Sequence, residues 1–183
     1  MEIKQVSING VYEIYPRAFS DERGYFLEVF REDLLRKHGI AETWVQENQS
    51  FSKKGTIRGL HFQKEPFAQA KLARVIVGKV LEVCVDLRKN SPTFGMHHAV
   101  ILDDQQHNML YLPAGFAHGF AALEDTVFSY RCSNHYHKES EGGVLWDDAE
   151  LDIDWQVDDP ILSDKDQILP SLKDFVQDSG GGL

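Results

Sequence analysis

Residues that can move protons gather in three stretches of this chain, and the first is residues 58–63 (RGLHFQ). There Arg58 and His61 flank Gly59 in a strand-like context. Strict alternation along a strand would point the two side chains to opposite faces. A glycine permits a bend or bulge, so the pattern leaves open whether Gly59 breaks the period and turns both side chains toward one site.

The other two stretches contribute a second histidine and a tyrosine. Residues 111–120 (YLPAGFAHGF) use a proline–glycine turn to place His118 near the start of a strand, and residues 128–130 (FSY) end on Tyr130. An imidazole titrates near neutral pH and can act as a base. A buried tyrosine most often packs with a hydrogen-bonded hydroxyl, so the pattern alone leaves catalytic and structural roles open for both.

Charged residues elsewhere give weaker signals. Lys71 opens an apolar strand, whereas the charged residues 164–166 have the composition of a solvated loop. The pattern alone therefore makes His61 the better candidate for acid–base chemistry.

The eight histidines do not form an evident metal motif. A site of the His-x-His, Glu, His type would need two imidazoles near His61, and only one is present, with His118 as a possible late ligand. Two histidines alone rarely make a tight site. The adjacent His97 and His98 would point to opposite faces of a strand, and residues 135–137 (HYH) lack further ligands. We expect no metal and no cofactor.

The elements that must position these residues are mostly strands. One helix is predicted over residues 31–38, with acidic residues early, basic residues late and Gly39 as a stop. Strands are predicted over residues 12–15, 24–30, 56–62, 72–77, 80–87, 98–102, 109–112 and 126–132. Many short strands separated by turn signals favour an all-β sandwich or jelly roll.

One predicted strand, residues 80–87, has an unusual polar face. Its apolar residues alternate with Glu82, Cys84 and Asp86. Such a face suits either an exposed acidic surface or the polar interior of a small barrel, which can hold one ligand. The pattern leaves both open.

Composition limits the classes of function. The chain has 183 residues, 42% of them hydrophobic and 26% charged, which suits one soluble domain. The net charge is −10 and no block of basic residues occurs, so we expect neither nucleic acid nor a membrane as partner. We expect a single domain over residues 1–176 and a flexible tail over residues 177–183, which end in SGGGL.

The compartment is expected to be the cytoplasm. The first ten residues have no apolar signal-peptide core. Cys84 and Cys132 lie in separate strand-like segments without CxxC spacing, which is typical of buried, free cysteines.

Seven landmarks, taken in order, resemble the family of dTDP-4-dehydrorhamnose 3,5-epimerases over roughly residues 12–170. They are DERGYF (21–26), VQENQS (45–50), RGLHFQ (58–63), KL (71–72), VDLRKNSPTFG (85–95), PAGFAHGF (113–120) and WDD (146–148). Each is weak alone, and their order and spacing together are specific.

The resemblance implies a fold, a partner and a reaction. The fold is a cupin-type jelly roll without a metal and with a few short helices. The partner is a second copy, in a homodimer that exchanges N-terminal strands. The substrate is a dTDP-4-keto-6-deoxy sugar, dTDP-4-dehydro-6-deoxy-D-glucose, epimerised at C3 and C5 to dTDP-4-dehydro-L-rhamnose through enolates in dTDP-L-rhamnose biosynthesis.

The resemblance also assigns roles to four catalytic residues. His61 matches the base and Asp166 its orienting partner. Tyr130 matches the acid on the other face of the sugar. Lys71 matches the stabiliser of the enolate oxygen.

A wider set matches substrate contacts in the family. Arg is apt for the diphosphate because its planar fork meets oxygens in pairs. For most of the others a plain structural role is equally open. The set is Arg23, Phe26, Glu28, Gln46, Glu47, Asn48, Arg58, Lys71, His118, Tyr136, Glu141 and Lys165.

Three departures from the family pattern leave sugar specificity open. Glu82 and Glu47 stand where the family often has Asp, and residues 154–156 (DWQ) replace a Trp-Pro ending. The alternatives are a single-site 3- or 5-epimerase or a ketoisomerase on a related sugar. A non-catalytic sugar-binding cupin is a third interpretation, although it would not need a complete set of acid, base and oxyanion stabiliser.

Overall fold

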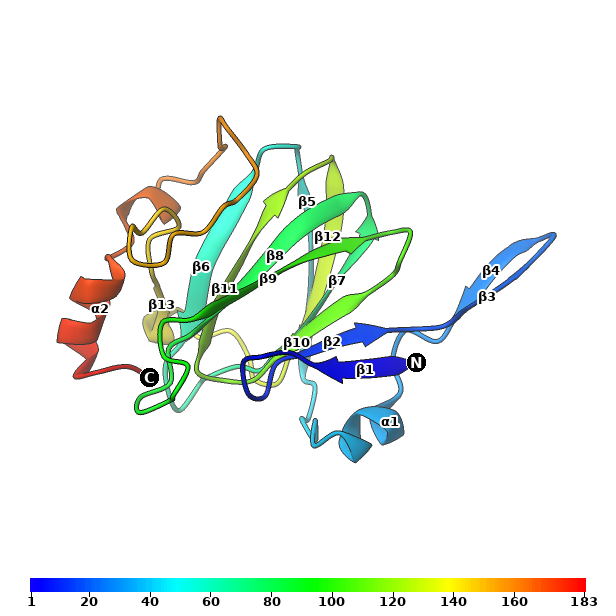
Figure 1. Ribbon diagram of the computed structural model, residues 1–183, viewed down its shortest axis with the longest axis horizontal. Coiled ribbons are helices and arrows are strands. Elements are labelled where there is room, and N and C mark those ends of the chain that lie inside the picture. Colours follow the sequence, from blue (N-terminus) through cyan, green and yellow to red (C-terminus); the bar gives the residue numbers. More distant parts are fainter.

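The computed structural model describes residues 1–183 and confirms an all-β chain (Figure 1). The strands are β1 (Glu2–Gln5), β2 (Tyr12–Tyr15), β3 (Ala18–Asp21), β4 (Gly24–Leu27), β5 (Gln46–Ser52), β6 (Ile57–Gln63), β7 (Lys71–Val77), β8 (Lys79–Asp86), β9 (His97–Asp103), β10 (Met109–Leu112), β11 (Phe116–Ala122), β12 (Thr126–Cys132) and β13 (Glu141–Gly143). The helices are α1 (Glu32–Lys37) and α2 (Leu172–Ser179), with 3₁₀ turns η1 (Lys138–Ser140) and η2 (Asp166–Ile168).

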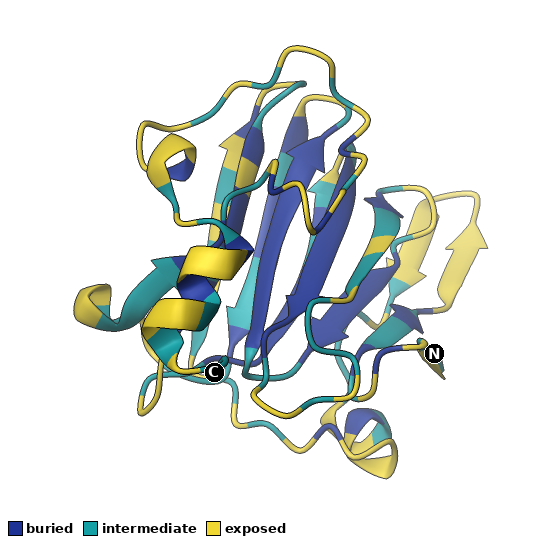
Figure 2. Ribbon diagram, turned by 60° about the vertical axis from the view of Figure 1, so that its left-hand side comes forward, coloured by how far each residue is buried: buried dark blue, intermediate teal, exposed yellow.

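Two antiparallel sheets face each other and enclose an apolar interior. One has the order β1-β2-β10-β7-β12-β5 and the other the order β13-β6-β11-β8-β9. Side chains from both sheets, such as Val75, Phe120 and Phe128, meet between them. Figure 2 shows these central strands as the most buried part of the chain. This sandwich is the jelly roll that the strand pattern predicted.

Strand β8 shows how the pattern of alternation builds the interior. Leu81 and Val83 pack outward, in a second apolar cluster that includes Phe175 of α2. Glu82 and Cys84 are fully buried on the opposite face. Of the two interpretations left open, the buried polar interior is therefore right and the exposed acidic face is wrong.

Only one of the two helices was predicted from the sequence. Helix α1 spans Glu32–Lys37 within the predicted range, with Glu32 and Arg36 paired at 2.7 Å. Helix α2 was missed, although Ser171 caps it by accepting the Asp174 N–H at 3.1 Å. Its buried residues, Leu172 and Phe175, cover the outer face of the five-stranded sheet.

The C-terminal segment lies against the barrel. The predicted flexible tail began at residue 177, but α2 continues to Ser179. Beyond it, the Leu183 N–H donates to Leu87 O at 2.7 Å and Leu183 O accepts from the Lys89 N–H at 2.8 Å. The domain boundary at residue 176 stays a prediction. No helix of the chain has the length and apolar character needed to cross a bilayer.

A buried carboxylate organises the turn after β8. Asp86 Oδ2 accepts from Arg88 Nη2 at 2.7 Å, Ser91 Oγ at 2.7 Å and Thr93 Oγ1 at 2.6 Å, and Oδ1 accepts from Arg88 Nε at 2.9 Å. Burial alone would raise the pKa of Asp86, but these hydrogen bonds outweigh it and lower the pKa to about 2. The ionised carboxylate therefore holds the segment together.

Replacing Asp86 by alanine should lower the free energy of unfolding by about 3 kcal/mol, because it leaves partly buried donors without their acceptor. Urea unfolding followed by circular dichroism measures this. Asp158→Ala, at an exposed position, is the control and should stay within about 0.5 kcal/mol of the wild type. Because the folded-state pKa is depressed, the difference should shrink as the pH falls from about 4 to 2. Equal midpoints for the two variants at neutral pH would contradict the assignment.

Candidate active site

A cavity of about 330 Å³ opens between the two sheets, beside the edge strand β5 of one sheet and strand β6 of the other. Its walls come from both sheets and from the segment that includes η2. The lining residues are Asn48, Gln49, Ser50, Arg58, His61, His118, Phe120, Tyr130, Ser163, Lys165 and Asp166. Seven of them were expected at a site from the sequence.

His61 and Asp166 form a hydrogen-bonded pair at this cavity. His61 Nε2 and Asp166 Oδ1 are 2.6 Å apart, and the Asp166 side chain is only 4% exposed. Burial works against ionised Asp166, but the bond and charge of His61 outweigh it, so the pKa of Asp166 lies below its ordinary value. The solvated-loop interpretation is therefore wrong for Asp166. An ionised carboxylate here can orient the imidazole and stabilise its protonated form.

Gly59 resolves the open question about the neighbouring strand. In the register of β6 against β11, His61 lies opposite His118 and Arg58 lies opposite Phe120. Strand β6 therefore has one more residue than β11 between these two positions. Gly59 has φ +147°, and a Cβ there would lie 2.5 Å from Gly119 Cα. Only glycine fits such a contact. The irregularity breaks the alternation, and both Arg58 and His61 line the cavity.

Tyr130 reaches the cavity from the other sheet. It lies on β12, whereas His61 lies on β6, so the two side chains occupy facing walls. The Tyr130 ring lies 5.8 Å from the His118 ring. Burial raises the pKa of Tyr130, so its phenol keeps a proton at neutral pH. A base on one wall and an acid on the other is the arrangement that inversion at carbon requires.

Lys71 is buried behind Tyr130 at the start of β7. Its side chain lies opposite Cys132 in the strand register, and Nζ is 5.8 Å from the Tyr130 ring centre. Burial lowers the pKa of Lys71 to about 8. Lys71 still carries a positive charge at neutral pH, and a fixed charge in a dry site stabilises a developing oxyanion strongly.

The rim of the cavity joins further expected residues. Lys165 Nζ pairs with Glu141 Oε1 at 2.5 Å, and Tyr136 Oη donates to Glu141 Oε2 at 3.0 Å. Gln46 Nε2 donates to Asn48 Oδ1 at 2.9 Å. These contacts brace the rim around the pair formed by His61 and Asp166.

Arg58 is a cation without an acidic partner. Its Nε donates to Ser52 Oγ at 3.0 Å and its Nη2 to Phe51 O at 3.3 Å. Since these acceptors are neutral, the positive charge at the cavity wall remains available to an anionic ligand.

Four expected contacts lie away from the cavity of the same chain. Arg23 and Phe26 sit on the hairpin β3–β4, which extends from the barrel (Figure 1), and Phe26 is 66% exposed. Glu28 pairs with Arg31, and Glu47 pairs with Arg131 on the outer face of β5. Within one copy, none of the four lies at the His61 cavity.

Sequence reasoning missed several lining residues. No sequence pattern assigns Gln49, Ser50 and Phe120 to the cavity, apart from their positions next to expected residues. Ser163 has such a pattern: it lies three residues before Asp166, and its Oγ accepts the Asp166 N–H at 3.2 Å. This spacing is a capping pattern that the solvated-loop interpretation concealed.

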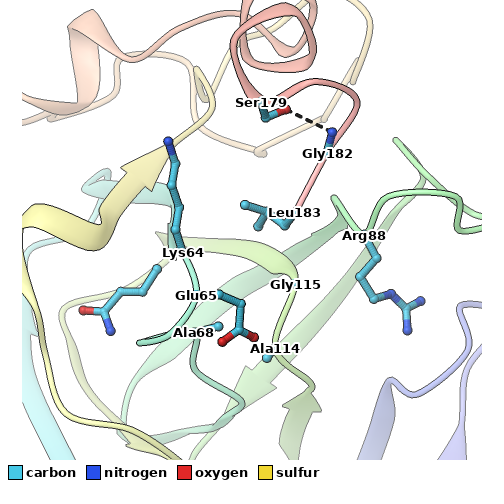
Figure 3. Close-up of a pocket in the computed structure, with 10 residues that line it drawn as sticks. Lys64, Glu65, Ala68, Arg88, Ala114, Gly115, Ser179, Gly182 and Leu183 are labelled. Atoms are coloured by element: carbon cyan, nitrogen blue, oxygen red, sulfur yellow. Dashed lines mark hydrogen bonds between the residues drawn. The ribbon is translucent and has the colours of Figure 1, made fainter.

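A larger cavity, of about 520 Å³, lies beside the C-terminal segment (Figure 3). Lys64, Glu65, Arg88 and Leu183 line it, and Ser179 Oγ accepts the Gly182 N–H at 3.0 Å in its wall. Its arginine, Arg88, is already paired with Asp86, and no hydrogen-bonded pair of an acid and a base lines this cavity. The smaller cavity is the better candidate for chemistry. Nowhere in the chain do three or more His, Cys, Asp or Glu side chains come together as they would to hold a metal ion.

The chain is similar to known proteins along most of its length. Residues 5–174 match the family model described as dTDP-4-dehydrorhamnose 3,5-epimerase. A relative with that name from Methanothermobacter thermautotrophicus is 44% identical, covering 93% of this chain and 94% of the relative. The Bacillus anthracis enzyme, solved with TDP and PPi, is 45% identical with a TM-score of 0.91, covering 93% and 99% of the two chains. ChmJ, a 3'-monoepimerase from Streptomyces bikiniensis solved with dTDP-quinovose, is 34% identical with a TM-score of 0.88, covering 96% and 89%.

Proposed function

Because the chain belongs to the dTDP-4-dehydrorhamnose 3,5-epimerase family, we propose that it converts dTDP-4-dehydro-6-deoxy-D-glucose to dTDP-4-dehydro-L-rhamnose. The observation that carries the mechanism is the placement of His61, bonded to Asp166, on one wall of a cavity and Tyr130 on the facing wall. The reaction belongs to dTDP-L-rhamnose biosynthesis.

The first step is removal of a proton beside the C4 ketone. Because Nε2 of His61 is occupied by Asp166, Nδ1 is the nitrogen that takes the proton from carbon. The electron pair of the broken C–H bond moves into the ring as an enolate, whose charge rests on the C4 oxygen. Lys71 stabilises that oxygen, and Asp166 stabilises the imidazolium.

The second step returns a proton to the same carbon from the opposite face. Tyr130 donates its phenolic proton, the C–H bond re-forms with inverted configuration, and a phenolate remains. Exchange with solvent then reprotonates Tyr130 and deprotonates His61. Carrying out the cycle at C3 and at C5 gives the double epimerisation.

The diphosphate end of the substrate requires positive charge in a chain whose net charge is −10. Arg58 has no acidic partner, and Lys165 lies at the rim. Arginine binds paired oxygens strongly at close range, so these local groups overcome the unfavourable field of the whole protein.

A homodimer with exchanged N-terminal strands is part of the proposal. The hairpin β3–β4 forms a separate two-stranded sheet, and Phe19, Tyr25 and Phe26 on it are 47%, 61% and 66% exposed. An isolated hairpin is marginally stable in water. Strand β5 has a free edge beside the cavity, which another strand can pair with. A partner's hairpin there would bring Arg23 and Phe26 to the site.

Mixed dimers test this exchange. Arg23→Ala and His61→Ala should each abolish most activity alone, because each homodimer loses both sites. Unfolding and refolding the two variants together should restore about a quarter of wild-type activity, since half of the dimers are mixed and each has one intact site. Activity no higher than the sum of the two variants would contradict the exchange.

We also propose the cytoplasm as the location. Both cysteines, Cys84 and Cys132, are free and buried, which is typical of proteins from reducing compartments.

The single-site alternative is favoured by one relative, the 3'-monoepimerase ChmJ. A coupled assay separates the two functions. With dTDP-4-dehydro-6-deoxy-D-glucose, a rhamnose-forming reductase and its reduced nicotinamide, the double epimerase yields dTDP-L-rhamnose. A single-site epimerase yields none, and that result would overturn the proposed function.

A further inference from the structure

The cavity has a buried carboxyl group behind it that the mechanism above does not use. Glu82 on β8 is 0% exposed, and its Oε1 lies 2.9 Å from His118 Nδ1. Its other oxygen, Oε2, has no hydrogen-bond partner and is alone in this among the buried side-chain nitrogen and oxygen atoms. The bond leaves Nε2 as the free ring nitrogen of His118, a residue that lines the cavity.

The missing partner indicates where the proton of this pair lies. An ionised carboxylate with one buried, bare oxygen bears a large desolvation cost, and Glu82 forms no ion pair with Lys71 or with any arginine. A protonated carboxyl that donates from Oε1 leaves only a carbonyl-type oxygen bare. That is the least costly of the buried arrangements.

Titratable groups on three strands surround Glu82: Lys71 on β7, His118 on β11 and Cys84 on β8. Burial raises the pKa of Glu82, and the positive charge of Lys71 on β7 opposes this. Burial also lowers the pKa of His118 on β11, as do the charges of Lys71 and His61. Cys84, on the same strand as Glu82, has a raised pKa because of burial and stays a neutral thiol. The pair is thus a neutral acid beside a neutral imidazole.

We propose that Glu82 is a positioning residue: its protonated carboxyl donates to His118 Nδ1 and thereby holds His118 with its Nε2–H toward the cavity, where it donates a hydrogen bond to an oxygen of the substrate. The inference rests on the proposed function for the identity of that oxygen, the one that becomes negative in the enolate. The partner of one ring nitrogen fixes which nitrogen carries the proton.

The opposite arrangement would work against the reaction. If Glu82 were ionised, it would accept from Nδ1–H, and a lone pair on Nε2 would face the developing oxyanion. A neutral imidazole that presents N–H is instead an effective electrophile for a carbonyl oxygen. Glu82 also leaves the charge of Lys71 uncompensated, so two donors act on the same oxygen.

The tautomer of His118 can be measured without any turnover. Long-range nitrogen–proton NMR correlations of the unliganded wild-type protein, with His118 assigned by His118→Gln, distinguish the two neutral forms. We expect His118 to be protonated at Nε2. Protonation at Nδ1, or at both nitrogens, at neutral pH would overturn the proposal. This outcome is independent of whether the substrate is epimerised.

Two variants connect the tautomer to catalysis. The amide of Glu82→Gln can donate to Nδ1 as the carboxyl does, so the tautomer should persist and kcat should fall by less than about fivefold. Glu82→Ala removes the donor, and kcat should fall by about 10- to 100-fold with little change in KM. Cys84→Ala, equally buried on the same face of β8, should keep kcat within about threefold. A loss in Glu82→Gln as large as in Glu82→Ala, with Nδ1 protonated, would overturn the proposal.

Discussion

Replacing His61 by alanine should lower kcat by about 10³-fold or more, because it removes the base and leaves Asp166 buried beside an empty space. The fall should appear in the chemical step and not in binding. His61 lies on one wall of the cavity, whereas the cations expected to bind the diphosphate are Arg58 and Lys165. Exchange of substrate C–H with solvent deuterium should therefore stop, whereas the affinity for dTDP should change by less than about threefold.

His135→Ala is the matched control for this variant. His135 is exposed, and its ring makes no hydrogen bond within the chain, so its removal should leave kcat near the wild-type value. Proton NMR in deuterated buffer follows the exchange, and calorimetry follows dTDP binding. Persistent exchange at both carbons in His61→Ala would show that another group is the base.

Replacing Tyr130 by phenylalanine should separate deprotonation from inversion. The ring still packs against His118, but the acid is absent, so inversion should fall by at least about 10²-fold. His61 can still remove a proton and return one to the same face. We therefore expect deuterium to enter the substrate with retained configuration.

The measurement is NMR of the recovered sugar nucleotide, which reports deuterium content and configuration together. Phe128→Leu controls for loosened packing, because it reduces the volume of a buried core side chain on β12, the strand that carries Tyr130. It should affect exchange and inversion equally. Inversion at the wild-type rate in Tyr130→Phe would exclude Tyr130 as the acid.

Local periodicity was sufficient to predict much of the fold. Strands β2, β10 and β12 lie at their predicted positions, because each has β-branched or aromatic residues bounded by turn residues. The alternation in β8 predicted an apolar and a polar face but left open which one points outward; the apolar face packs under α2. Strand β5 was missed because its inward-facing residues are polar, so its alternating burial does not appear as an alternation of apolar residues.

Elements defined by distant contacts could not be predicted in this way. The sequence 164–166 has the composition of a solvated loop, and only the bond from Asp166 to a histidine 105 residues earlier makes it part of the site. Likewise, β4 ends at Leu27 and not at the predicted residue 30, since the hairpin turns back toward α1. No local pattern records either fact.

The site was predicted partly from residues and partly from resemblance. Gly59 raised the question of whether Arg58 and His61 share a face, and the close contact with Gly119 answers it. The roles of Tyr130 and Lys71 came from the resemblance, because a single tyrosine or lysine at the start or end of a strand is most often structural. The free oxygen of Glu82 could not have been found from sequence.

The most direct test of the central claim is proton NMR of the purified protein with dTDP-4-dehydro-6-deoxy-D-glucose in deuterated buffer, coupled to a rhamnose-forming reductase. A base and an acid on facing walls that act at both centres predict deuterium at C3 and at C5, together with dTDP-L-rhamnose. Deuterium at one carbon only, without dTDP-L-rhamnose, would contradict the double epimerisation, and no exchange in folded, dTDP-binding protein would contradict catalysis at this site altogether.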